Sequence, residues 1–329
     1  MSDDPFDCFG SDDESDDQNP DTESNHKNPL ESTATSTSST RTGTRDEESC
    51  GVLAFHANTE RSLLMHVKNY NCSQENLNVH ELPCQIVLKK IDWYCSSRHW
   101  MMNVGPEKGA IIQNSLQEAM EKKSQSQSGK KFVAVELGTY CGYGSIFLSS
   151  MLKVHKERYQ DIDFNLFTVE INPEYAAVAR EMIQIAQLDD IITVLDNDLL
   201  MDGSTGDVGE LVKSAMVEKF GHDDGVVGMG IDFLMIDHDK DSYLADLQRL
   251  ERSGLIRRGT IVAADNVIFA GIHEYIDYMR GLAKKGIVRT CTREASVEYS
   301  STEQILKDGV GKLSPFHFKR RYIRIHVFT

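Results

Sequence analysis

Residues 132–145 read FVAVELGTYCGYGS, an apolar run that passes directly into a loop with three glycines. The run is short and rich in valine, which is typical of a strand buried on both faces. Gly138, Gly142 and Gly144 supply a tight turn and allow the backbone to approach a ligand closely. Because such turns also occur for packing alone, the loop by itself is weak evidence for a ligand site.

The change from a strand pattern to a helical pattern recurs along the chain. Further β-rich runs lie at 164–170, 191–195, 231–236 and 260–265, and helical patterns separate them. Buried strands that alternate with helices predict an α/β fold with a Rossmann-like, doubly wound sheet. The loops at the carboxyl ends of these strands are therefore the first places to look for a ligand site.

The two ends of the chain depart from this alternation. Helical spacing of apolar residues predicts helices over 85–94 and 107–122, ahead of the first strand. After the fifth strand, runs at 287–299 and 322–328 lack a crossover helix between them. Only an antiparallel pair can be joined without such a crossover. We therefore expect a mainly parallel, seven-stranded sheet with one antiparallel strand.

Residues 1–55 form an acidic segment rich in serine and threonine, and 56–329 form one folded domain in this interpretation. The 329 residues carry a net charge of −16, and residues 1–50 alone hold 14 acidic against three basic side chains. That segment thus contributes −11, and the remaining 279 residues contribute −5. Its apolar content is too low to offset chain entropy, which predicts a disordered tail. Ser11 and Ser15 precede acidic runs, so a kinase that prefers acidic sites is a candidate partner.

Composition excludes several classes of protein. The acidic charge disfavours nucleic-acid binding, which needs clustered lysine and arginine. No apolar run approaches the roughly 18–20 residues of a membrane span, and the N-terminus lacks the pattern of a signal peptide. Seven cysteines without a C-x-x-C spacing predict neither a disulfide framework nor a zinc ribbon. We therefore expect a cytoplasmic protein without a nucleic-acid or membrane partner.

The second strand ends at Glu170, about 30 residues after the glycine loop. A carboxylate there can accept hydrogen bonds from both hydroxyls of an adenosine ribose. The glycine spacing also fits some nicotinamide reductases, but these need a tyrosine followed four positions later by lysine, which none of the 11 tyrosines has. The carboxylate of Glu136 beside the loop would repel a pyrophosphate but suits the cationic, phosphate-free S-adenosylmethionine. We therefore expect S-adenosylmethionine as the cofactor.

Polar side chains also follow the fourth and fifth strands. Asp237 ends the fourth strand and Asp265–Asn266 end the fifth, so their oxygens are expected at neighbouring strand ends. Carboxylate and amide oxygens suit octahedral Mg²⁺, and Lys240 could lie over the same ion. Each acid alone is better explained as a cap of the following helix. The whole set, beside a nucleoside site, favours a metal centre.

Five stretches of the sequence together closely resemble the catechol O-methyltransferase family, which are class I, cation-dependent S-adenosylmethionine O-methyltransferases. The resemblance runs from about Arg61 to Leu313, with the stretches in the same order. They are WMMNVG (100–105), ELGTYCGYGS (136–145), FTVEINPEYAA (167–177), DHDKDSYLADLQRLERSGLIRRGT (237–260) and ADNVI (264–268).

The resemblance implies a Mg²⁺-dependent transfer of a methyl group from S-adenosylmethionine to a hydroxyl of a catechol-type small molecule. In the family pattern, Lys240 matches the general base and Glu298 matches the carboxylate that binds the second hydroxyl. The positions that match metal ligands are Asp237, Asp265 and Asn266. The positions expected around the donor are Val104, Glu136, Gly138, Tyr140, Gly142, Gly144, Ser145, Glu170, Asp237 and His238. The positions expected around the acceptor are Trp100, Met102, Lys240, Asn266 and Glu298.

Several positions depart from the family pattern. The tryptophan after the histidine of the fourth-strand motif is Asp239 here, and a proline of the next loop is Ala270. The serine of the glycine loop is Gly144, with Ser145 one place later, and residues 198–200 lack the polar pair expected at the adenine. Asp239 resembles instead the D-x-D-K pattern of caffeoyl-CoA O-methyltransferases. The alternatives are thus an enzyme of that type and a catalytically inactive, methyltransferase-like scaffold that binds the donor and acts through its tail.

Overall fold

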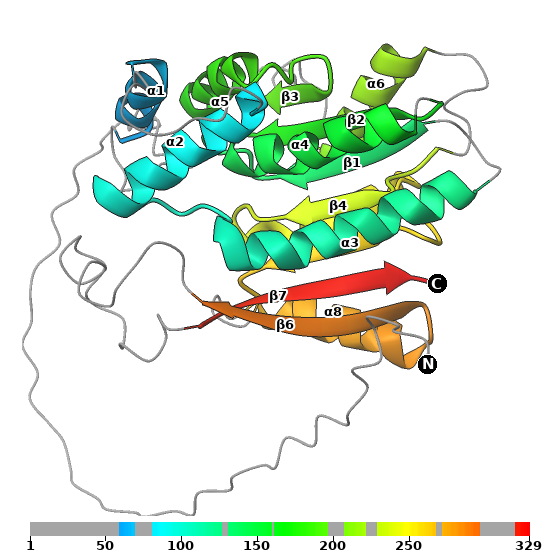
Figure 1. Ribbon diagram of the computed structural model, residues 1–329. Helices are drawn as coiled ribbons and strands as arrows, with labels where there is room; N and C mark the ends of the chain where they lie inside the picture. Colours follow the sequence, from blue (N-terminus) through cyan, green and yellow to red (C-terminus); the bar gives the residue numbers. More distant parts are fainter. Residues whose placement is uncertain are drawn as a thin grey trace, which may run out of the picture. The chain divides into compact units, whose positions relative to one another are not determined.

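The computed structural model describes residues 59–69, 81–126, 131–159, 161–196, 207–221, 229–267, 272–296 and 320–329 (Figure 1). Several predictions lie outside these residues and stay predictions. They are the disordered tail over 1–55 with Ser11 and Ser15, the departures at 198–200 and Ala270, and the acceptor-binding Glu298.

Seven strands form one sheet in the order β3-β2-β1-β4-β5-β7-β6 (Figure 1). Strands β1 to β5 pair in parallel, and β7 runs antiparallel to both β5 and β6. This confirms the predicted Rossmann-like, mainly parallel sheet with one antiparallel strand. The bounds are β1 Lys131–Leu137, β2 Asp163–Glu170, β3 Ile192–Asp196, β4 Phe233–Ile236, β5 Ile261–Asp265, β6 Val288–Ser296 and β7 Arg320–Phe328.

Helices cover both faces of the sheet. Apolar residues of α6, α7 and α8 join Val135, Leu234 and Val262 in one core on the first face. On the second face α4 packs on β2, α3 packs on β5 and β6, and α1 and α2 pack on α5 and α4. The bounds are α1 Thr59–Asn69, α2 Pro83–Ser97, α3 Gly105–Gln125, α4 Tyr143–Arg158, α5 Pro173–Ile185, α6 Val208–Phe220, α7 Tyr243–Arg252 and α8 His273–Lys284.

Strand β1 lies next to the central strand β4, and the strand order reverses between these two strands. The chain proceeds from β1 to β2 and β3 on one side and later returns to β4 and β5 on the other (Figure 1). In open α/β sheets, ligands bind outside the carboxyl ends of the strands at this reversal. Side chains alternate between the two faces of a strand, so Val135 enters the core below α6 to α8 while Glu136 faces the α4 side.

Candidate active site

The glycine loop between β1 and α4 is held against the end of β4. Gly138 has φ of +102°, and a Cβ there would overlap the backbone carbonyl oxygen of Asp237. Because that oxygen belongs to the backbone directly after β4, it cannot move aside as a flexible side chain could, and no side chain fits at this position. Gly142, the N-cap of α4, has φ of +89°, and the non-glycine Tyr140 has φ of +48°. The predicted tight turn is thus present, and it brings the loop beside Asp237.

Glu170 fixes the other side of this loop. Its Oε2 accepts a hydrogen bond of 2.7 Å from the backbone N–H of Tyr140, and its Oε1 accepts one of 2.9 Å from the N–H of Asn172. Burial raises the pKa of Glu170, and these backbone hydrogen bonds oppose the rise. The carboxylate is therefore held in one orientation at the end of β2, where it could receive the hydroxyls of a ribose.

Glu136 is buried on the α4 side of β1. Its Oε2 accepts hydrogen bonds from the hydroxyl of Ser145, on α4, and from that of Thr168, on β2, the latter at 2.7 Å. Thr168 is also its register partner in the parallel pair of strands. Burial raises the pKa of Glu136 to about 7, and the two hydroxyl donors oppose that rise. The predicted donor site thus contains a second carboxyl group, whose charge changes near neutral pH.

Helix α1 reaches the glycine loop through a buried side chain. The hydroxyl of Tyr140 donates a hydrogen bond of 2.9 Å to Oε1 of Glu60, which is 5% exposed. The ring of Tyr140 also meets that of Tyr175, on α5, edge to face at a centroid distance of 5.0 Å. Burial raises the pKa of Tyr140 far above its usual range, so this hydroxyl stays protonated. The first described helix therefore forms part of the wall of the site.

A second polar cluster lies at the ends of β4 and β5. The Nζ of Lys240 is 3.0 Å from Oδ1 of Asp237 and 2.6 Å from the hydroxyl oxygen of Tyr243. That hydroxyl lies 3.0 Å from the carbonyl oxygen of Asp265 and 2.9 Å from that of Ile236. Lys240 begins a 3₁₀ turn, Lys240–Ser242, that leads into α7. The predicted residues of the two strand ends thus form one connected group.

Asp265 has a buried counter-ion that sequence patterns did not suggest. The Nζ of Lys108, in the first turns of α3, lies 2.6 Å from Oδ2 of Asp265, and both side chains are almost fully buried. The Oδ1 atom of Asp265 accepts a hydrogen bond of 2.8 Å from the N–H of Asn266. Asn266 adopts a left-handed backbone with φ of +57°, which asparagine tolerates better than most residues. This conformation turns the chain sharply after β5.

The side chains that could hold a divalent cation here are two carboxylates and one amide. Among the described residues no three His, Cys, Asp or Glu side chains form a metal-binding group, so such a site would need the amide of Asn266. Its Oδ1 is buried and has no hydrogen-bond partner in the part of the chain that the structure describes. Asp237 and Asp265 could supply carboxylate oxygens, which Mg²⁺ prefers. The ammonium groups of Lys108 and Lys240 compensate the two carboxylates within the protein.

The remaining predicted site residues differ in their burial and in their hydrogen-bond partners. The Nε2 of His238 is 2.8 Å from Oδ2 of Asp246, while its Nδ1 is buried without a hydrogen-bond partner among the described residues. Trp100 and Val104 are buried, and Met102 is 37% exposed. Asp239 is exposed and accepts a hydrogen bond from the hydroxyl of Ser242. The rim of the site therefore presents a carboxylate where the family has a tryptophan.

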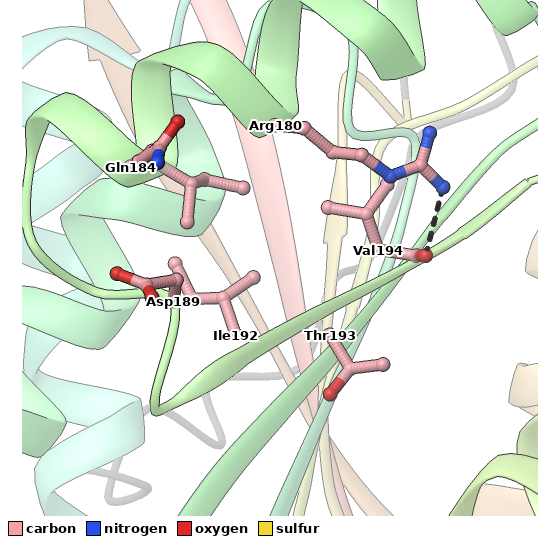
Figure 2. Close-up of a pocket in the computed structure, with 7 residues that line it drawn as sticks. Arg180, Gln184, Asp189, Ile192, Thr193 and Val194 are labelled. Atoms are coloured by element: carbon pink, nitrogen blue, oxygen red, sulfur yellow. Dashed lines mark hydrogen bonds between the residues drawn. The ribbon is translucent and has the colours of Figure 1, made fainter.

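A pocket of about 360 Å³ lies elsewhere, between α5 and the edge strand β3 (Figure 2). Figure 2 shows Arg180 reaching across it to the carbonyl oxygen of Val194, at 3.2 Å. The same guanidinium lies 2.6 Å from Oδ2 of Asp196. None of the predicted site residues lines this pocket. This pocket is therefore separate from the predicted site residues at the strand ends.

Sequence reasoning missed four residues that complete the two clusters. Glu60 and Lys108 reach the site from helices far away in the sequence, and a local pattern carries no signal for such contacts. Thr168 and Tyr243 lie inside the quoted motifs but look like ordinary strand and helix residues there. For Thr168, the register opposite Glu136 would have been an indication.

A Rossmann-like sheet with a glycine loop after its first strand and a carboxylate at the end of its second is typical of one class, the S-adenosylmethionine-dependent methyltransferases. Residues 135–267 match the family model described as a methyltransferase domain. Catechol O-methyltransferase B of Danio rerio is 33% identical over 227 residues, which are 69% of this chain and 72% of that protein. Catechol O-methyltransferase of Sus scrofa is 32% identical over 64% of this chain and 94% of its own length.

The chain belongs to the catechol O-methyltransferase family, and it is an S-adenosylmethionine-dependent O-methyltransferase. Among solved structures, an O-methyltransferase from Bacillus cereus in complex with SAH matches 81% of this chain and 97% of its own chain, with 16% identity and a TM-score of 0.44. A transmembrane O-methyltransferase of Homo sapiens is 28% identical over 198 residues. Within the described part of the present chain, no helix is long and apolar enough to cross a membrane.

Proposed function

We propose that the chain methylates one hydroxyl of a catechol-type small molecule in a Mg²⁺-dependent reaction. The observation that carries this proposal is the position of Lys240, whose Nζ lies 3.0 Å from Asp237. Through the hydroxyl of Tyr243, the same nitrogen connects to the backbone of Asp265. A nitrogen base and the oxygens proposed to hold the metal thus share one hydrogen-bonded group.

In this proposal the metal would be held by Asp237, Asp265 and Asn266. Bound Mg²⁺ would supply a positive charge that lowers the pKa of a phenolic hydroxyl, and S-adenosylmethionine would supply the methyl group. The phenolic oxygen bonds to the methyl carbon, and the electron pair of the broken S–C bond stays on sulfur. Lys240, in its uncharged form, accepts the hydroxyl proton at Nζ. Tyr243 holds that nitrogen in place and, because its pKa is raised by burial, does not compete for the proton.

The donor is assigned to the loop after β1. Glu170, held by two backbone N–H groups, would accept the ribose hydroxyls, and the buried Glu136 would face the cationic amino-acid end of S-adenosylmethionine. Gly138 allows this loop to lie directly beside Asp237, so donor and metal sites are adjacent. Holding the two reactants in fixed positions is expected to supply much of the rate acceleration.

Methyl transfer from labelled donor to a panel of catechols tests the proposal. We expect product with Mg²⁺, its loss with a chelator, and a fall in kcat of about 10²-fold or more in Lys240→Ala, which is the usual contribution of a general base. Lys219→Ala on α6 is the matched control, because Lys219 is exposed and its Nζ donates a hydrogen bond to the backbone carbonyl oxygen of Asp190. We expect it to retain full activity.

Two other results would point to the alternatives. Activity that survives both the chelator and Lys240→Ala would contradict the mechanism. Donor binding in calorimetry without product from any acceptor would favour an inactive scaffold. A clear preference for a caffeoyl-CoA acceptor would instead indicate an enzyme of the caffeoyl-CoA O-methyltransferase type, the alternative that Asp239 suggests.

A further inference from the structure

The donor site of this chain contains a buried network of hydroxyl groups around Glu136. Ser145, Thr168 and Thr139 are all at most 2% exposed, as is Glu136 itself. The Oγ1 atoms of Thr139 and Thr168 lie 2.6 Å apart, and Thr168 Oγ1 lies 2.7 Å from Oε2 of Glu136. Ser145 Oγ contacts the same Oε2. Two hydroxyl groups, from α4 and β2, thus contact one oxygen of this carboxylate, and Thr139 of the loop contacts the second of them.

The number of protons on these groups determines which group donates each hydrogen bond. A hydroxyl donates one proton, and an ionised carboxylate only accepts. Because Thr168 donates to Glu136, Thr139 must donate to Thr168, and Ser145 contributes a second donor to the same oxygen. Hydrogen bonds in such a chain strengthen one another in a low-dielectric interior. The network therefore favours the ionised form of Glu136 and fixes its orientation.

The second oxygen of Glu136 lies over a glycine. A Cβ on Gly144, in the first turn of α4, would overlap Oε1 of Glu136, and the next neighbour is the apolar Val104 at 4.0 Å. Any side chain at position 144 would therefore displace the carboxylate. Gly144 and Ser145 also replace the family's serine at this position of the loop, so the arrangement is a property of this chain.

We propose that Gly144, Ser145 and Thr168 are positioning residues for Glu136, which hold its Oε2 and leave its Oε1 directed to the cationic amino-acid end of the methyl donor. The proposal rests on the proposed function, in which Glu136 contacts S-adenosylmethionine. In it Ser145, whose hydroxyl is fully buried behind the carboxylate, acts through Glu136 and does not touch the donor. Gly144 is required because it provides the space that Oε1 occupies.

The electrostatics of the site agree with this role. Burial, followed by the charges of Asp237 after β4 and Glu170 on β2, raises the pKa of Glu136 to about 7, although the hydroxyls of Ser145 and Thr168 lower it. An acid whose pKa is raised to about 7 loses its charge as the pH falls through that value. A cationic ligand should thus bind more weakly below pH 7, and removal of a hydroxyl donor should move this loss to higher pH.

Calorimetric titration of the full-length protein with S-adenosylmethionine, without any acceptor, tests the role of Gly144. We expect Gly144→Ala to raise the Kd by about 10- to 100-fold, the usual worth of a hydrogen bond to a charged group. The flexible end of Glu136 moves and not the backbone, so thermal unfolding of the donor-free protein should change little. Gly281→Ala on α8, where a Cβ meets nothing within 4 Å, is the matched control and should retain the Kd.

The pH dependence of the same titration tests the hydroxyl donors. We expect Ser145→Ala and Thr168→Val to shift the pH at which donor binding weakens upward by about half a unit or more. Ser149→Ala removes a buried hydroxyl one turn further along α4 that has no partner among the described residues, and it should cause no shift. A wild-type Kd in Gly144→Ala, or equal shifts in Ser145→Ala and Ser149→Ala, would overturn the proposal. Because no acceptor is present, failure here is separate from failure of the catechol assignment.

Discussion

Lys108 and Lys122 lie on the same helix and each pairs with a carboxylate, but burial separates their energetic roles. The side chains of Lys108 and Asp265 are 4% and 2% exposed, whereas those of Lys122 and Glu118 are 41% and 22% exposed. Loss of one partner from a buried pair leaves an uncompensated charge and costs about 3–5 kcal/mol. An exposed pair one helical turn apart contributes about 0.5 kcal/mol. The single residue Lys108 therefore ties α3 to the end of β5.

We expect Lys108→Met to lower the free energy of unfolding by about 3–5 kcal/mol, because Asp265 then remains buried without its counter-ion. Lys122→Met, on the exposed face of α3, should lower it by less than about 1 kcal/mol. Urea unfolding of the donor-free protein measures both values. Equal losses in the two variants would show that the ion pair of Lys108 does not carry this stability.

Helix α5 begins at a cap that is also part of the donor site. The side chain of Asn172 accepts hydrogen bonds from two backbone N–H groups of the first turn, while its own N–H donates to Glu170. Helix α6 begins at Asp207 with the same kind of cap. The two helices thus share a device for stability, but only the cap of α5 contacts a residue proposed to bind the donor.

Asn172→Ala and Asp207→Ala should each lower the free energy of unfolding by about 1 kcal/mol, the usual worth of a helix cap. Only Asn172→Ala should also raise the Kd for S-adenosylmethionine, by about threefold to tenfold, because the turn that orients Glu170 loosens. Urea unfolding and calorimetry separate the two effects. A similar rise in Kd for Asp207→Ala would show that the weaker binding follows from lower overall stability and not from the loss of the Asn172 cap.

At the level of the whole chain, most of the net negative charge and the predicted site residues lie in different parts of the sequence. Residues 1–50 carry −11 of the net charge of −16, yet all predicted site residues lie between 100 and 298. We expect a chain reduced to 51–329 to bind S-adenosylmethionine with unchanged Kd and to unfold at an unchanged urea concentration. It should leave an anion-exchange column at lower salt, because it carries only −5. A change in unfolding free energy above about 1 kcal/mol would contradict the separation.

Much of the fold and half of the site follow from patterns that are local in the sequence. The alternation of apolar runs and helical stripes predicts the sheet, because strand and helix periods are set by a few neighbouring residues. The loop after β1 and the acids at 170, 237 and 265 were predicted because each lies at or directly after the end of a strand. Carboxyl ends of parallel strands meet at one edge, so position along the chain already implies proximity there.

The counter-ions and hydrogen-bond partners of those acids depend on contacts between distant segments. Lys108 meets Asp265 across 157 residues, and Tyr140 meets Glu60 across 80. The space over Gly144 is taken by Glu136 only because α4 packs against β1 and β2. Sequence patterns thus indicate which carboxylates lie at the strand ends. The packing of helices onto the sheet decides which charged groups and hydroxyls pair with those carboxylates. The physical reason is that burial and pairing are properties of the assembled layers, and no short stretch of the chain contains both partners.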